Sequence, residues 1–133
     1  MTAMERTNLL LAKVLDLALT EGVSHWSLSF SDLSLSDDYA THFFPCVEWL
    51  EAEGLIRVGK YIRTLDGIAT GSIENISLTS RGMAILGQKV EIDGTPEQLS
   101  SAIKKVSEGR VDYNRVMDAL GGLLGGIIKS VSS

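Results

Sequence analysis

Residues 48–57 read EWLEAEGLIR, and residues 76–86 read ISLTSRGMAIL. The first stretch predicts a helix that ends at Gly54, because glycine readily adopts the left-handed backbone that follows a helix, and then a strand. The second predicts a strand and a helix that begins after Thr79, whose hydroxyl can accept a hydrogen bond from the first turn. These stretches therefore predict a helix, two strands and a second helix, in that order.

A β-hairpin is the expected connection between the two helices. Residues 55–64 and 72–78 carry the strand-forming residues, and Asp66, Gly67 and Gly71 lie between them. Aspartate and glycine favour the backbone angles of tight turns, so the chain is expected to reverse direction there.

The part of the chain before residue 48 predicts four further elements. Apolar residues recur at helical spacing over residues 5–19, and Gly22 ends that helix. Residues 26–31 alternate between apolar and polar, which is typical of a short half-buried strand. A short helix over residues 31–35 and a longer one over residues 36–50 are expected after serine and aspartate caps.

The longer helix contains Pro45, which lacks a backbone N–H and clashes with the preceding turn. The proline is therefore expected either to kink this helix or to split it in two, and the sequence leaves both outcomes open.

The last forty residues predict a helical extension. Residues 95–98 read TPEQ and predict a helix start, with a threonine cap and a proline in the first turn, after a connector at residues 90–93. A final helix is expected over residues 112–130. The fold class is then α+β and mostly helical, with one domain at residues 1–88 and an extension at residues 89–133 that either packs on it or mediates dimerisation.

Residues 31–86 resemble a winged helix-turn-helix domain of the small bacterial and prophage regulator type. The resemblance is carried by W-L-x-x-x-G-L-I at residues 49–56 and I-S-L-T-x-x-G at residues 76–82. It implies that the helix before Gly54 enters the DNA major groove and that the hairpin, or wing, touches the DNA backbone or minor groove.

The charge distribution conflicts with that implied role of the helix. The chain has 12 lysine and arginine residues against 17 aspartate and glutamate residues, a net charge of −5. Between Val14 and Ile56 there are eight carboxylates and no lysine or arginine. DNA phosphates repel carboxylates, and the helix lacks the basic side chains that dominate base recognition.

Most of the candidate nucleic-acid-binding residues therefore lie outside the helix: Arg57, Lys60, Arg63 and Arg81. Thr41 and His42 are added as hydrogen-bonding groups on the helix. We expect a regulatory protein, of transcription or prophage type, that contacts double-stranded DNA chiefly through the basic wing. One alternative is an adaptor or inhibitor that binds no DNA and whose acidic helix meets a basic protein partner. Another is that these lysine and arginine side chains are ordinary solvated charges on an exposed hairpin.

The terminal helix has a wide apolar half, which includes Leu120, Leu123, Leu124, Ile127 and Ile128. Gly121, Gly122, Gly125 and Gly126 fall on the other half. Four glycines cost an isolated helix roughly 3–4 kcal/mol relative to alanine, so packing must stabilise it. We expect a homodimer through this helix, with Gly121 and Gly125 allowing close approach of a second backbone; the alternative is docking on the first helix of the same chain.

No reaction class is indicated by the remaining residues. Asp38, His42 and Cys46 are spaced four apart, but Pro45 interrupts their stripe and a structural zinc site needs a fourth ligand. The other histidine, His25, stands at a strand start. We therefore expect neither an enzyme nor a metal or cofactor site.

The cellular setting is expected to be the cytoplasm. A single cysteine rules out an internal disulfide, which fits a reducing compartment. Residues 1–19 lack the features of a signal peptide, and no apolar run reaches the ~18–20 residues that span a bilayer, so no membrane partner is expected.

Overall fold

The computed structural model describes residues 2–92, 94–109 and 113–132, and it describes the side chains of these residues except 113 and 125–132. In these ranges the chain is α+β, with helices predominating and small antiparallel sheets, and no helix is both long and apolar enough to cross a membrane. In chain order the elements are α1 (Ala3–Glu21), β1 (Trp26–Leu28), the 3-10 helices η1 (Phe30–Leu33) and η2 (Asp37–His42), α2 (Phe43–Ala52), β2 (Ile56–Arg57), β3 (Lys60–Arg63), β4 (Gly71–Leu78), α3 (Ser80–Leu86), β5 (Lys89–Ile92), β6 (Thr95–Gln98), α4 (Leu99–Ser107) and α5 (Tyr113–Ser132).

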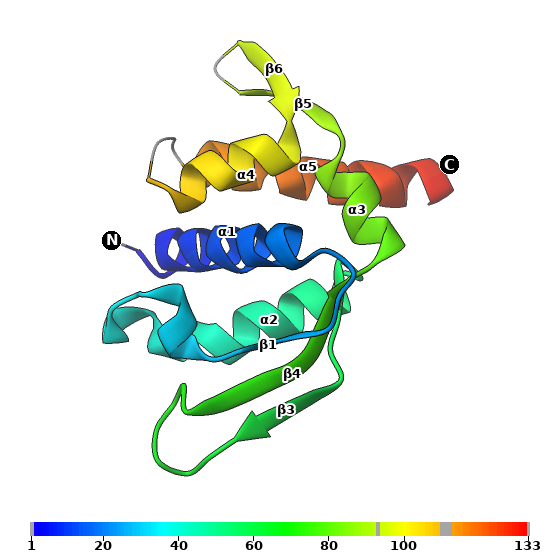
Figure 1. Cartoon of the computed structure of the whole chain (residues 1–133). Coiled ribbons are helices and arrows are strands. Elements are labelled where there is room, and N and C mark those ends of the chain that lie inside the picture. The colour runs from blue at the N-terminus through cyan, green and yellow to red at the C-terminus, as the bar shows by residue number, and fades with distance from the viewer. Residues whose placement is uncertain (1, 93, 110–112, 133) are drawn as a thin grey trace.

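Helix α1 lies at the centre of the molecule. Figure 1 shows α4 and α5 on one side of α1, and α2 and the main sheet on the other. The apolar residues of α1 occupy most of its circumference, so Leu10, Val14 and Leu15 are completely buried. Both flanking layers are therefore attached to the same helix.

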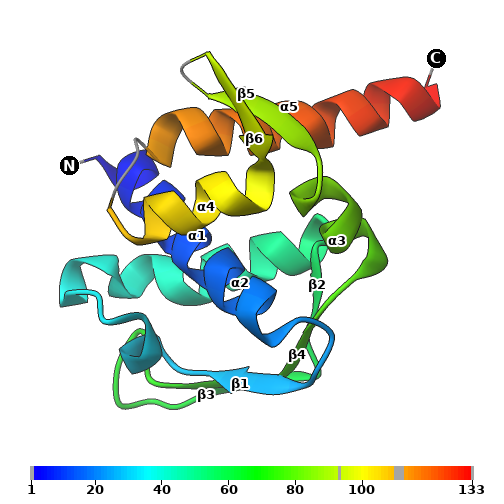
Figure 2. The ribbon, with the colours of Figure 1, turned by 45° about the horizontal axis from the view of Figure 1, so that its top comes forward.

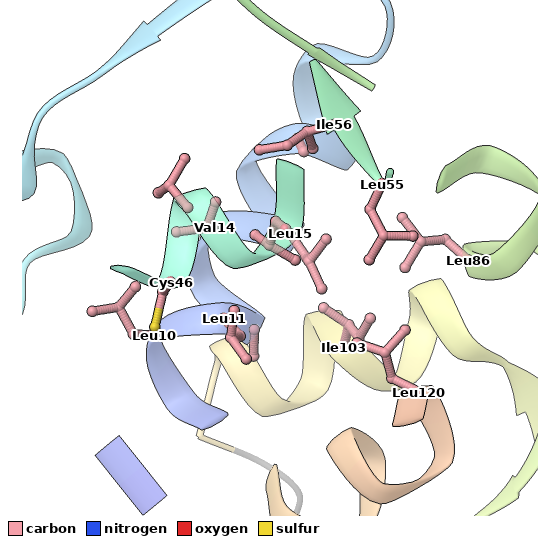
Figure 3. Packing of buried hydrophobic residues seen from close by; sticks show 14 of the residues in the cluster. Leu10, Leu11, Val14, Leu15, Cys46, Leu55, Ile56, Leu86, Ile103 and Leu120 are labelled. Atoms are coloured by element: carbon pink, nitrogen blue, oxygen red, sulfur yellow. The ribbon is translucent and has the colours of Figure 1, made fainter. Parts of the chain in front are cut away.

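The C-terminal extension shares the core of the preceding part. Figure 3 shows Leu15 of α1, Leu55 next to β2, Leu86 of α3, Ile103 of α4 and Leu120 of α5 converging in one interior. Each of these side chains is at most 1% exposed. The extension thus packs on residues 1–88 and has no separate core among the described residues.

The main sheet is built around β4, which pairs antiparallel with β1, β2 and β3. In the β3–β4 ladder, Lys60 lies opposite Glu74 and Arg63 opposite Gly71. The hairpin predicted over residues 55–78 is confirmed, and its first arm is divided into β2 and β3.

Gly54 and Gly82, the glycines of the two sequence motifs, are each required for a different structural reason. Gly54 has φ +79° directly after the end of α2, the left-handed conformation predicted for it. At Gly82 a Cβ atom would lie 2.2 Å from the carbonyl oxygen of Leu55, so α3 can cross this backbone only without a side chain there. Thr79 caps α3 as predicted, because its hydroxyl accepts a hydrogen bond from the Gly82 N–H at 2.9 Å.

The helix predicted over residues 36–50, which contains Pro45, is divided into two adjoining parts of different type. The first part is the 3-10 helix η2, and α2 begins at Phe43. Pro45 is then the third residue of α2, in the first turn, where its missing N–H would have had no partner within the helix.

The helix start predicted at residues 95–98 is wrong. These residues form β6, which pairs antiparallel with β5, and α4 begins only at Leu99. The predicted connector at residues 90–93 is largely strand, with Ile92 buried against the core. Gly94, at φ +79°, allows the chain to reverse between the strands, so the extension is a hairpin followed by two helices.

The strand predicted over residues 26–31 is also shorter than expected. The structure ends β1 at Leu28, and Phe30 begins η1. The backbone N–H of Ser29 donates to the Asp32 carboxylate at 2.8 Å, and this capping interaction starts the helical turn before the strand can continue. The short helix predicted at residues 31–35 is accordingly a 3-10 turn that ends at Leu33.

The Gly82→Ala variant is expected to be less stable by about 1–3 kcal/mol, because the added methyl group would collide with a backbone oxygen that packing holds in place. The matched change Gly122→Ala, in α5, meets no atom within 4 Å. It should stabilise the helix by roughly 0.5–1 kcal/mol through helix propensity. Urea unfolding of both variants measures the difference, and equal effects would contradict the close approach at Gly82.

Candidate functional site

The cation Arg81 supports the end of α2. Its Nε donates a hydrogen bond to the carbonyl oxygen of Glu53 at 2.9 Å, and the side chain is half-buried against Gly54. The last carbonyls of a helix have no partner within the helix, so this contact satisfies one of them. Arg81 therefore has a structural use that the sequence alone did not indicate.

The positive charge of Arg63 is neutralised by a carboxylate of α2. Its guanidinium forms an ion pair with Glu48 of α2 and lies over the ring of Phe44, with 4.5 Å between Cζ and the ring centroid. Both charged side chains are about half exposed, so the pair contributes little stability. It nevertheless cancels a positive charge that was expected to face DNA.

The cation Lys60 lies beside a carboxylate that stays ionised. Ser27 and, at 3.0 Å, Ser72 donate hydrogen bonds to Glu74, which lowers the pKa of that carboxyl; attraction to Lys60 lowers it further. Because Glu74 holds its negative charge, the positive potential around Lys60 is reduced.

Arg57 is the predicted cation without such a partner. It is exposed on β2, and its side chain makes no hydrogen bond or ion pair with the part of the chain that the structure describes. The four predicted cations therefore differ in their surroundings and do not form one unpaired basic surface.

The two uncharged candidates on the helix side are on η2. Thr41 is exposed and His42 is half-buried, and the same 3-10 helix exposes Asp37 and Asp38. We call Asp37 and Asp38 the acidic pair. A phosphate approaching Thr41 or His42 would meet these two carboxylates at the start of the same short helix.

A carboxylate that the sequence did not single out fastens the hairpin to α2. Glu51 accepts hydrogen bonds from the hydroxyl of Tyr61 at 2.9 Å and from the backbone N–H of Val58 at 3.2 Å. Burial, followed by the hydrogen bond to Glu51, raises the pKa of Tyr61, which therefore remains a donor at neutral pH. Glu51 thus fixes how β2 and β3 leave the helix.

The β3–β4 loop, residues 64–70, presents an apolar tip. Leu65 is fully exposed, Ile68 is 68% exposed, and Ile62 at the end of β3 is also exposed. The loop is closed by hydrogen bonds from Thr64 to Thr70 at 2.6 Å and from Thr70 to the carbonyl of Gly67 at 3.0 Å. Several exposed apolar side chains in one loop make this loop a candidate interaction site.

Several of the predicted dimerisation residues are buried within the chain itself and are not accessible to a second copy. Leu120 and Leu124 are buried in the chain's own core and Leu123 is partly buried, whereas Gly121 is exposed in a groove beside Trp49 of α2. Gly125, Ile127 and Ile128 lie outside the described side chains. Figures 1 and 2 show the backbone of α5 running past the rest of the fold. Self-association through α5 stays a prediction.

The residues considered as metal ligands are divided between η2 and α2. Asp38 and His42 are on η2, while Cys46 is on α2 and buried. Burial raises the pKa of the Cys46 thiol to about 12, which disfavours the thiolate that a metal requires. Within the described ranges, no three acidic, histidine or cysteine side chains are grouped to hold a metal ion.

Comparison of the chain with protein-family models, with curated proteins and with solved structures finds no match. Its function has therefore to be inferred from its own surfaces.

The Glu51→Ala variant is expected to lose about 1–3 kcal/mol of stability, because a half-buried N–H and a hydroxyl lose their acceptor. The matched change Glu48→Ala removes only the exposed pair with Arg63 and should cost at most about 1 kcal/mol. Thermal or urea unfolding measures both variants, and a smaller loss for Glu51→Ala than for Glu48→Ala would refute the fastening role.

Proposed function

We propose that residues 1–88 form a winged helix that recognises a protein rather than DNA. The element order supports this fold: α1, β1, the helical segment η1–η2, α2 and then an antiparallel hairpin whose β4 also pairs with β1. In this arrangement α2 takes the position of the recognition helix and the β3–β4 loop that of the wing.

The observation that carries the proposal is the apolar tip of the wing. A DNA-binding wing needs cations near phosphates, since these contacts supply most of the affinity. This loop instead presents Leu65 and Ile68, while Arg63 at its base is paired with Glu48. Apolar groups gain little from phosphates and much from an apolar pocket on a protein.

The acidic pair indicates the charge of the partner. In Figures 1 and 2 the cyan segment that carries η2 and the β3–β4 loop lie at the same end of the molecule. A partner with an apolar pocket flanked by lysine or arginine would engage Leu65 together with Asp37 and Asp38. The protein would then act as a regulatory adaptor or inhibitor.

A site-specific photocrosslinker tests this in the cells that produce the chain. Placed at Leu65, it is expected to give one discrete protein adduct, which the double change Asp37→Lys and Asp38→Lys removes. The same crosslinker at Ser101, exposed on α4 at the other side of the molecule, is the matched control and should give no such adduct. Equal adducts from both positions, or an adduct indifferent to the charge reversal, would count against the proposal.

DNA contact through the exposed Arg57 and Lys60 is the second candidate, favoured by their position on the hairpin strands. A mixed-sequence duplex at ~50 mM salt, where phosphate contacts are strongest, distinguishes the two. We expect no shift with the unaltered protein, and a weak shift once Asp37 and Asp38 are both changed to lysine. Binding by the unaltered protein that Arg57→Glu with Lys60→Glu abolishes would replace protein recognition with DNA binding.

A further inference from the structure

A hollow of about 520 Å³ lies at the end of the hairpin away from the β3–β4 loop. It forms where the loop after α1, the link between β2 and β3, the end of β4 and the start of α3 meet, and Figure 2 shows these segments side by side. Its size falls within the range of small-molecule sites. We call it the Arg57 hollow.

Five polar side chains with unused hydrogen-bonding capacity line the Arg57 hollow: Arg57, His25, Asn75, Ser77 and Ser80. None of these side chains forms a hydrogen bond or ion pair with the described residues. No carboxylate lines the hollow, although the chain as a whole is acidic. The charge and the donors therefore favour an anion.

Apolar side chains complete the lining. Val23 and Met83 are 63% and 46% exposed, and Leu78 lies next to them in the hollow. An anion that fits both the polar and the apolar lining of the hollow needs an apolar body besides its charged group. A single guanidinium binds a carboxylate through two parallel hydrogen bonds, whereas a phosphate dianion calls for more positive charge than one arginine supplies.

The wall of the hollow is fixed before any ligand arrives. The N–H of Gly59 donates to the carbonyl oxygens of Glu74 at 3.0 Å and Asn75 at 3.2 Å. Asn75 has φ +55°, and a Cβ atom at position 59 would lie 2.7 Å from its Cβ. Such close contact leaves the two backbones little freedom, so a ligand would meet a formed site.

We propose that the Arg57 hollow binds a small organic monocarboxylate. Arg57 pairs with the carboxylate, the hydroxyl of Ser80 and the amide of Asn75 orient it, and Val23, Leu78 and Met83 contact the apolar body. This site is independent of the proposed protein recognition, because the segments that line the hollow meet at one end of the hairpin. Figure 1 shows the β3–β4 loop at the other end.

Amide NMR spectra of the full chain, titrated with phenylacetate and with hexanoate to ~20 mM, test the site at the weak affinities expected of such small ligands. We expect shifts centred on the amides of Gly59, Ser77 and Ser80. Phenylacetamide, the neutral analogue of phenylacetate, and inorganic phosphate should each bind about tenfold more weakly.

Two variants assign the effect to the guanidinium. Arg57→Gln is expected to weaken phenylacetate binding about tenfold, whereas Lys60→Gln, an equal charge change on the next strand outside the hollow, should leave it unchanged. The dispersion of the spectra shows that each variant is folded. Absence of shifts with both carboxylates, equal binding of phenylacetamide or phosphate, or unchanged affinity of Arg57→Gln would each overturn the proposal.

Discussion

The burial of α1 on two opposite sides is the constraint on which the rest of the structure depends. Leu10, Val14 and Leu15 are completely enclosed, and each such side chain contributes about 1.5–3 kcal/mol through removal from water. Because α4 and α5 cover one side of this helix and α2 and the sheet the other, neither layer has a complete core without it. This arrangement positions the hairpin, α2 and both candidate sites.

The sequence predicted the elements whose causes are local. Gly54 ends a helix by its left-handed backbone, and Thr79 begins one by its hydroxyl, so both boundaries were placed correctly. The helix start predicted at residues 95–98 was wrong for a local reason too, since a threonine and a proline suit a helix start as well as an edge strand. Only the buried Ile92 and the turn at Gly94 decide in favour of the strand, and that decision depends on the distant core.

The site was less predictable than the fold because its chemistry depends on contacts across the chain. Arg63 and Arg81 looked like equal members of a basic surface, yet one is paired with Glu48 and the other serves the end of α2. Neither partner adjoins its arginine in the sequence. Leu65, which the sequence placed in an ordinary turn, became informative only once its full exposure was known.

The exposed tip of the β3–β4 loop also bears on how much of this protein a cell can hold. Leu65 and Ile68 are exposed to water in the free chain, and apolar side chains of this kind adhere to one another as concentration rises. Asp66 between them opposes such adhesion only through its single charge. If a protein partner covers this loop as proposed, synthesis of the two chains in balanced amounts would keep the adhesive, uncomplexed form scarce.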